Sequence, residues 1–167
     1  MILMSPSVAA FALWNWCVAD RIEAGHIRAA VAAASGRPVA ALGGDAIDAG
    51  PPGALLCDVW HGVGDFPTFV DCYLVPAAIS ETRVAAGLAR RLGVACLLPD
   101  DTLNPTRHLL ALPDGTLRPA HVKITDTVAG ERRSGLRFCT TVDPWCRRQS
   151  GCRQSRWAPG SVASAAA

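Results

Sequence analysis

The sequence lacks a long apolar run. The best candidate, from Val8 to Ala19, contains Asn15 and is shorter than the ~18 residues that a membrane span requires. The first residues, Met1 to Met4, include none of the basic side chains that open a secretory signal. Charged residues make up only 18% of the 167, but 50% are hydrophobic, which excludes a wholly disordered chain. These features predict a single folded domain in the cytoplasm, without membrane association.

Signatures of catalysis and of cofactor binding are also missing. The sequence contains no G-x-S-x-G elbow, no G-x4-G-K-[ST] phosphate loop and no H-E-x-x-H motif. The glycines near Gly43 do not fit G-x-G-x-x-G, the dinucleotide-binding pattern. We therefore expect no cofactor, and a noncatalytic role is favoured without excluding an enzyme.

The seven cysteines do not form a recognisable disulfide or zinc pattern. An odd number of cysteines, without a signal peptide, indicates reduced thiols rather than a disulfide scaffold. Cys139, Cys146 and Cys152 have the spacing C-x6-C-x5-C, which lacks the C-x2-C knuckles that present two thiolates to one zinc ion. A zinc ribbon is therefore not expected there.

Charge is unevenly divided along the chain. Residues 1–130 carry 9 basic and 12 acidic side chains, a net charge of −3, whereas residues 131–167 carry 7 basic and 2 acidic, a net charge of +5. The basic part has no sustained hydrophobic period. We therefore expect a domain boundary near Gly130, followed by a poorly ordered tail. Any nucleic-acid binding would use this tail, through its arginines and Trp145 and Trp157. A solvated appendage without a binding role is the favoured interpretation of this tail.

Turn signals and apolar periodicity predict a mixed α/β fold for residues 1–130. Strands are expected at 8–18, 38–42, 54–61, 68–75, 94–98, 107–112 and 116–124, and helices at 21–34 and 81–91. Two helices are too few to cover both faces of a sheet. The prediction is a two-layer sandwich, a ferredoxin-like variant, with a largely antiparallel sheet, both helices on one face and a C-terminal hairpin. The opposite sheet face would then lie open.

The predicted hairpin formed by residues 54–61 and 68–75 places chemically distinct side chains on its two faces. If Gly62 faces Pro67, the face that would lie beneath the helices is small and mostly apolar. On the open face, three cross-strand pairs follow: Asp58 with Asp71, Trp60 with Phe69, and Leu56 with Tyr73. Two carboxylates directly opposite each other repel, so without a partner this pair lowers stability.

This acidic and aromatic surface has three functional interpretations. Asp58 and Asp71 could form a general acid/base pair, although no nucleophile is identifiable beside them. They could bind Mg²⁺ or Ca²⁺, although a sheet face rarely supplies the remaining oxygen ligands. They could instead meet Arg or Lys of a protein partner, with Trp60, Phe69 and Tyr73 supplying buried area. The partner surface is favoured, and ordinary solvated strand residues or a shifted register are the alternative.

A second pair of candidate residues depends on the turn at Asp114-Gly115. If this turn contains two residues, His108 faces His121 across the hairpin. Facing imidazoles could hold a metal, but the pattern contains no third ligand. Structural or incidental histidines are the favoured interpretation.

One stretch of the sequence resembles a known family. The residues concerned are Val84-Ala-Ala-Gly-Leu-Ala-Arg-Arg-Leu-Gly-Val94, Cys96-Leu-Leu-Pro-Asp-Asp101, Asn104-Pro105, Leu109-Leu110 and Pro113-Asp-Gly115. This succession of helix, strand and hairpin resembles the small cytosolic immunity proteins of bacterial toxin–immunity systems. The resemblance covers roughly 30 of the 167 residues. It implies a noncatalytic protein that binds a toxin domain, often a basic nuclease, and blocks its active site.

Together, these observations predict a cytoplasmic bacterial binding protein. It would neutralise a basic toxin domain through the open sheet face around Asp58, Trp60, Phe69, Asp71 and Tyr73. The alternative is a small enzyme that uses the paired carboxylates or the histidine pair, with or without a metal.

Overall fold

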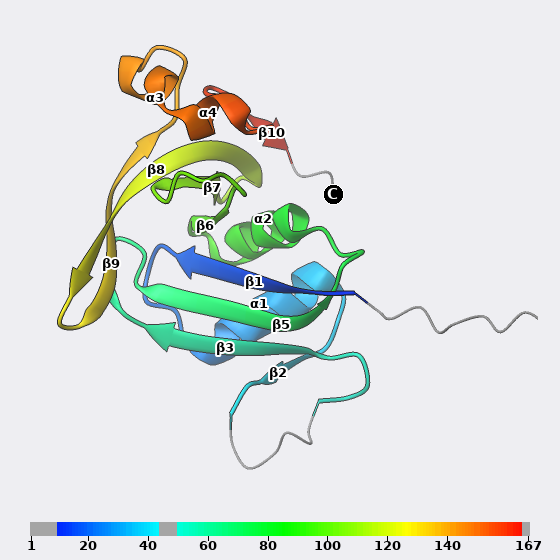
Figure 1. Ribbon diagram of the computed structural model, residues 1–167. Coiled ribbons are helices and arrows are strands. Elements are labelled where there is room, and N and C mark those ends of the chain that lie inside the picture. Colours follow the sequence, from blue (N-terminus) through cyan, green and yellow to red (C-terminus); the bar gives the residue numbers. More distant parts are fainter. Residues whose placement is uncertain (1–9, 44–49, 165–167) are drawn as a thin grey trace, which may run out of the picture.

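The computed structural model describes residues 10–43 and 50–164, which form one large sheet with four helices (Figure 1). In chain order the elements are β1 (Phe11–Val18), α1 (Ala24–Ser35), β2 (Val39–Ala41), β3 (Leu55–His61), β4 (Val63–Gly64), β5 (Thr68–Pro76), α2 (Glu81–Leu92), β6 (Cys96–Pro99), β7 (Arg107–Ala111), β8 (Thr116–Thr127), β9 (Gly130–Phe138), α3 (Pro144–Arg148), α4 (Ser150–Gln154) and β10 (Ala163–Ser164). Residues 1–4, for which the sequence predicts no secretory signal, and the first two residues of the strand predicted at 8–18 lie outside the described residues.

The sheet confirms the predicted mixed α/β class and is larger than predicted. Its ten strands run in the order β2-β3-β5-β1-β6-β7-β8-β9-β4, with β10 added beside β8. All pairs are antiparallel except β2 with β3 and β4 with β9. Because β4 follows β3 after one residue and pairs with β9, the sheet curls until β9 lies beside the chain that continues β3.

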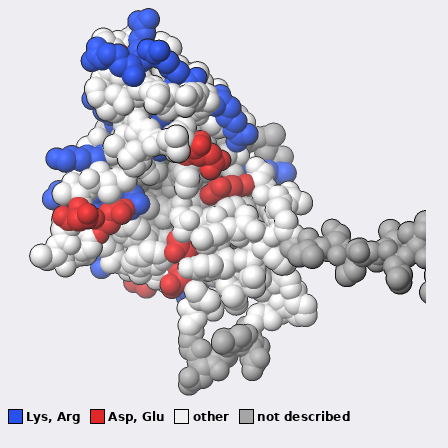
Figure 2. Space-filling model, in the orientation of Figure 1, with Lys and Arg blue, Asp and Glu red and all other residues white. Residues whose placement is uncertain are grey.

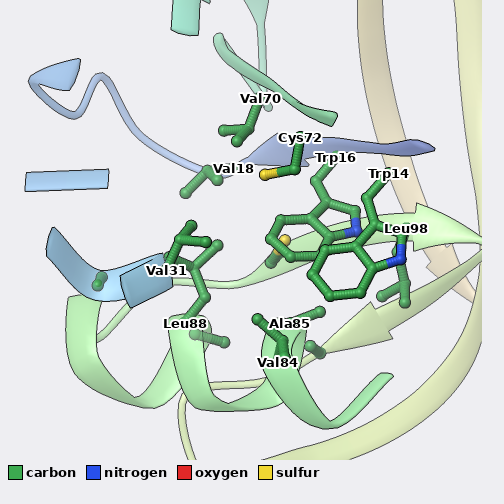
Figure 3. Close-up of a cluster of buried hydrophobic side chains, with 14 of the residues drawn as sticks. Trp14, Trp16, Val18, Val31, Val70, Cys72, Val84, Ala85, Leu88 and Leu98 are labelled. Carbon is green, nitrogen blue, oxygen red and sulfur yellow. The ribbon is translucent and has the colours of Figure 1, made fainter. Parts of the chain in front are cut away.

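The main hydrophobic core lies between α1, α2 and one face of the sheet. Trp14 and Trp16 of β1 are 3% and 1% exposed, and their rings stack with centroids 5.1 Å apart (Figure 3). Val31 of α1 and Leu88 of α2 are in the same cluster. Burial of such side chains is worth about 1.5–3 kcal/mol each, so this layer contributes strongly to stability.

Helix α2 has clear start and stop signals. The Ser80 hydroxyl accepts a hydrogen bond from the Arg83 backbone N–H, and Gly93 ends the helix with φ 69°. Gly87 faces α1, where an added Cβ would lie 2.9 Å from Ala34 Cβ. The absence of a side chain at Gly87 therefore allows the two helices to approach closely.

The other sheet face is filled by a second, smaller cluster. Cys17, Phe66, Leu97, Leu110 and Val122 are all buried in it. These residues come from β1, β6, β7, β8 and the turn between β4 and β5. This face is therefore covered by the curl of the sheet rather than by helices, and only the β3–β5–β1 side of it stays open.

Replacing Gly64 by alanine should open the junction between β4 and β9. Gly64 has φ 103°, and an added Cβ would lie 2.4 Å from the Arg133 carbonyl oxygen. We expect the backbone conformation alone to cost about 1–3 kcal/mol, and the Asp65 N–H bond to Arg133 O (2.8 Å) to weaken. Chemical denaturation and hydrogen exchange at Asp65 measure both effects.

The control for this substitution is Gly25→Ala in α1. Nothing lies within 4 Å of the position that a Cβ would take at Gly25, so alanine should not lower stability there. Equal losses in the two variants would contradict a specific role for Gly64.

The boundary predicted near Gly130 falls in the turn between β8 and β9, two paired strands of the same sheet. Residues 131–164, which the sequence predicts as a poorly ordered tail, contain β9, α3, α4 and β10. The last residues of that tail, 165–167, lie outside the described residues. The net charge therefore changes sign within a continuous sheet.

Among the helices that the structure describes, none is both long enough and apolar enough to cross a membrane.

Candidate functional site

The predicted register of the β3–β5 hairpin is confirmed. Asp58 pairs with Asp71, Trp60 with Phe69, and Leu56 with Tyr73. The alternate residues Cys57, Val70 and Cys72 are fully buried beneath the helices. The Gly62 N–H donates to the Pro67 carbonyl (2.8 Å), which closes the hairpin where the sequence places it. The acidic and aromatic residues therefore share the face without helices.

Trp60 and Phe69 form a flat aromatic platform on this face. Their ring centroids are 5.5 Å apart and their planes differ by 8°. Trp60 is 43% exposed, whereas Phe69 packs against the smaller cluster. The Arg133 guanidinium lies over the Phe69 ring, 5.1 Å from its centroid. The platform therefore already has a guanidinium at one of its rings, with the indole ring open to solvent.

The two carboxylates have different surroundings. Asp71 accepts hydrogen bonds from Asn15 Nδ2 (2.6 Å) and from the Tyr73 hydroxyl (3.4 Å). Burial and the neighbouring Asp71 raise the pKa of Tyr73, so its hydroxyl keeps its proton at neutral pH. No cation of the described residues forms an ion pair with Asp58 or Asp71. The charge of this pair is therefore available to a group from outside the chain.

A hollow of about 540 Å³ adjoins this platform. It is lined by residues of β1, β3, β5, β7 and β9 that include Asn15, Cys17, Trp60, Phe69, Asp71, His108, Glu131 and Arg133. Glu131 and Arg133 form an ion pair at 2.5 Å, which leaves Asp71 as the uncompensated charge of the wall. The hollow is therefore suited to an amphipathic, positively charged group.

Sequence reasoning did not bring residues of β1, β7 and β9 to this face, and it named His108 of β7 only as a partner for His121. For Asn15 the sequence does contain a signal of its position. Strand alternation places its side chain on the sheet face away from the buried Trp14 and Trp16. Glu131 and Arg133 lie beyond the predicted boundary at Gly130, and only the curl of the sheet brings them beside β5.

Two groups in the wall of the hollow are held in neutral forms. Burial raises the pKa of Cys17 to about 11, so it is a thiol rather than a nucleophilic thiolate at neutral pH. Burial lowers the pKa of His108, which favours its neutral imidazole. The His108 Nδ1–H donates to the Thr106 carbonyl at 3.2 Å. Neither group is activated as a nucleophile.

The predicted pairing of His108 with His121 is wrong. His108 pairs with Ala120 and His121 with Arg107, because the turn contains three residues, 113–115, instead of two. Gly115 has φ 86°, as a three-residue hairpin loop requires. A one-residue shift moves a side chain to the other sheet face. His108 therefore lies in the hollow, and His121 lies on the opposite face beneath α3 and α4.

The basic side chains of the C-terminal region gather elsewhere. Arg147, Arg148 and Arg153 surround a shallow hollow of about 810 Å³ on α3 and α4. In Figure 2, basic side chains gather at the top of the view, where Figure 1 places these two helices. Trp145 packs its edge against His121, with centroids 4.7 Å apart, and Trp157 packs against the main core. The two tryptophans that the sequence analysis considered for base stacking, Trp145 and Trp157, therefore pack against other residues of the chain.

No family model, curated protein or solved structure matches this chain.

Proposed function

We propose that the protein is a noncatalytic binding protein whose open sheet face recognises a basic protein partner. The observation that carries this proposal is the pair Asp58 and Asp71, directly opposite each other on β3 and β5 without a cation of the described chain. Such a pair repels and lowers stability until a positive group joins it. The two carboxylates lie beside the exposed Trp60 side chain, and an exposed tryptophan is a residue type that often dominates binding at interfaces.

The chemistry of the hollow favours an arginine of the partner. A guanidinium offers donors to the Asp71 carboxylate and a flat surface to the Trp60 indole. Arg133 makes the same kind of contact with Phe69 from within the chain. The partner's arginine would therefore stack on Trp60 at the open side of the aromatic platform. Its charge would neutralise the paired carboxylates, and Tyr73 would lie at the edge of this surface.

A binding role is favoured over an enzymatic one by the state of the groups around the carboxylates. Cys17 is protonated, with a pKa of about 11, and His108 faces away from His121 across the sheet. Among the described residues around the hollow, neither Cys17 nor His108 is an activated nucleophile, and His108 and His121 do not form a pair.

The role we propose for this binding is that of a cytoplasmic immunity protein. The acidic and aromatic face suits the blocking of a basic toxin domain, the activity that the resemblance over Val84–Gly115 implies. For such a protein, we expect the gene to lie directly downstream of a large toxin gene. We also propose that β3-β5-β1-β6 with α1 and α2 forms a ferredoxin-like unit, supported by this strand order and by the core that the two helices share.

The test is a pair of charge variants of the carboxylates. Asp58→Asn should raise the free energy of unfolding by about 0.2–1 kcal/mol, because it removes the repulsion with Asp71. Asp58→Lys with Asp71→Lys should abolish capture of a partner from the native host, since losing charge pairs at an interface costs about 2–5 kcal/mol. Denaturation measures the first effect. Affinity capture followed by mass spectrometry measures the second and shows whether the partner is basic.

The matched control reverses two exposed carboxylates that do not line the hollow, Glu23→Lys with Asp101→Lys, with the same change in net charge. It should leave partner capture intact. Capture that survives reversal of Asp58 and Asp71, or that is lost equally in the control, would overturn the assignment of this face.

A further inference from the structure

Four metal-binding side chains meet in the interior beneath α3 and α4. They are His121 of β8, Cys139 just after β9, Cys146 of α3 and Cys152 of α4. His121 is 2% exposed, Cys139 is 1% exposed, and Cys146 and Cys152 are fully buried. None of them belongs to the open face or its hollow.

The distances among three of these side chains, His121, Cys139 and Cys152, are close to those around a tetrahedral zinc ion. Cys139 Sγ lies 3.5 Å from Cys152 Sγ, which lies 3.5 Å from His121 Nε2. The three ligand atoms all fall within 4.8 Å of one another. Cys146 lies in the same buried cluster, with its thiol beside Cys139. A tetrahedron with zinc–sulfur bonds of ~2.3 Å has sulfur–sulfur edges of about 3.8 Å, so His121, Cys139 and Cys152 need only small side-chain shifts. The thiol of Cys146 lies outside this group of three and must turn toward it to become the fourth ligand.

The hydrogen bonds of His121 favour the tautomer with the proton on Nδ1, which leaves the Nε2 lone pair free to bind a metal. The Thr106 hydroxyl donates to Asn104 Oδ1 (2.9 Å), so its oxygen is free to accept from His121 Nδ1–H at 3.3 Å. The proton is thereby held on Nδ1, and the Nε2 lone pair points toward Cys152. An outer hydrogen bond of this kind orients most metal-binding histidines.

A buried cation accompanies the cysteines. Arg107 is 2% exposed, and its guanidinium donates to Asp100 and to the carbonyls of Gly151 and Trp157. Its Nε has no hydrogen-bond partner among the described residues. A thiolate is a strong acceptor, and a zinc ion with three thiolates carries one net negative charge. Arg107, next to Cys139, would stabilise that charge.

The two short helices of the C-terminal region have little hydrophobic core of their own. Helices α3 and α4 have five residues each. The buried cluster beneath them consists of the three cysteines, with Trp145 packed against it. Units of this size generally need a metal or a disulfide in place of a hydrophobic core.

We infer that His121, Cys139, Cys146 and Cys152 bind one structural Zn²⁺ ion. Binding forms three zinc–sulfur bonds and one zinc–nitrogen bond and releases the three thiol protons to solvent. Protein ligands fill all four positions, so the ion has no open site for a substrate and its role is to hold α3 and α4 on β8. The spacing H-x17-C-x6-C-x5-C does not match a known zinc-binding motif, because the ligands come from separate parts of the fold rather than from one local turn.

The first experiment uses the unmodified full-length chain, purified under reducing conditions without chelator. Elemental analysis should find one zinc per chain. In that form, mass spectrometry after alkylation should show Cys139, Cys146 and Cys152 protected, and a strong chelator should expose all three together. A reduced chain that takes up no zinc, or a disulfide between Cys139 and Cys152 in the purified protein, would overturn the inference.

Variants then test the ligand set. Titration of the reduced protein with Co²⁺ should give the spectrum of a tetrahedral thiolate site. Cys146→Ser should weaken metal binding more than about 100-fold, whereas Thr106→Val, which removes the outer hydrogen bond, should weaken it about 10–100-fold. Cys17→Ala, a buried cysteine outside the cluster, should leave affinity unchanged. Unchanged affinity in Cys146→Ser would refute the four-ligand site, even if a three-ligand site remained.

Discussion

Replacing Arg107 by methionine should lower the free energy of unfolding by about 3–5 kcal/mol, which is a large fraction of the stability of a domain this size. The ion pair between Arg107 and Asp100 is shielded from solvent, with side-chain exposures of 0% and 1%. Loss of the guanidinium leaves the Asp100 carboxylate buried without its counter-charge. It also removes the donors to the Gly151 and Trp157 carbonyls, which connect the C-terminal region to β7. Hydrogen exchange of residues 150–164 should accelerate alongside the loss of stability measured by denaturation.

A double-mutant cycle separates the lost charge pair from lost packing. Asp100→Asn keeps an acceptor for Thr102, whose backbone and hydroxyl both donate to Asp100 Oδ1. The double variant with Arg107→Met should therefore lose less stability than the two single variants predict together, since no unpaired charge remains. Strict additivity would contradict a buried ion pair. Arg137→Met is the exposed comparison: Arg137 pairs with Asp143 while 53% exposed, and its loss should cost at most about 1 kcal/mol.

Replacing Trp16 by alanine should cost about 3–5 kcal/mol of folding free energy. Trp16 is 1% exposed and stacks on Trp14, and its indole N–H donates to Glu81 Oε1 at 2.8 Å. The substitution leaves a cavity between β1 and α2 and removes the donor that holds the half-buried Glu81 carboxylate. Burial already raises the pKa of Glu81, and loss of this hydrogen bond should raise it further. Guanidinium denaturation followed by circular dichroism measures the loss of stability.

Trp60 provides the matched control because it is the same residue type on the open face. At 43% exposure, Trp60→Ala should cost about 1 kcal/mol, mostly its stacking on Phe69, while weakening partner binding. Trp16→Phe should fall between the two, because the ring is kept and the donor to Glu81 is lost. If Trp60→Ala lowered the free energy of unfolding as much as Trp16→Ala, the core between the helices and the sheet would not be the main source of stability.

Local signals predicted the elements of the first 124 residues well. The strand alternation and turn residues around Gly62 and Pro67 were sufficient for the β3–β5 register. The signals that begin and end α2, Ser80 and Gly93, are likewise local, and the helix predicted at 81–91 lies within Glu81–Leu92. In each case the deciding interactions occur within the segment or between neighbouring strands, so the sequence carries them directly.

The turn at Asp114-Gly115 shows where such reasoning fails. The dipeptide Asp-Gly fits a two-residue hairpin loop and also the end of a three-residue loop. The strand pairing that follows from these two loops differs by one residue. That single residue decides whether His108 and His121 share a face. Here it separates them, placing His108 in the hollow and His121 with the cysteines.

The sequence by itself determined the elements, the two faces of the central hairpin and the acidic and aromatic character of the open one, because period-2 alternation is a local property. Only the tertiary structure decided how the sheet closes, which brings Glu131 and Arg133 to the hollow. It also decided that the C-terminal region continues the sheet and that Cys139 and Cys152 meet His121. Contacts between residues far apart in the chain depend on the packing of every intervening element, and no local pattern records them.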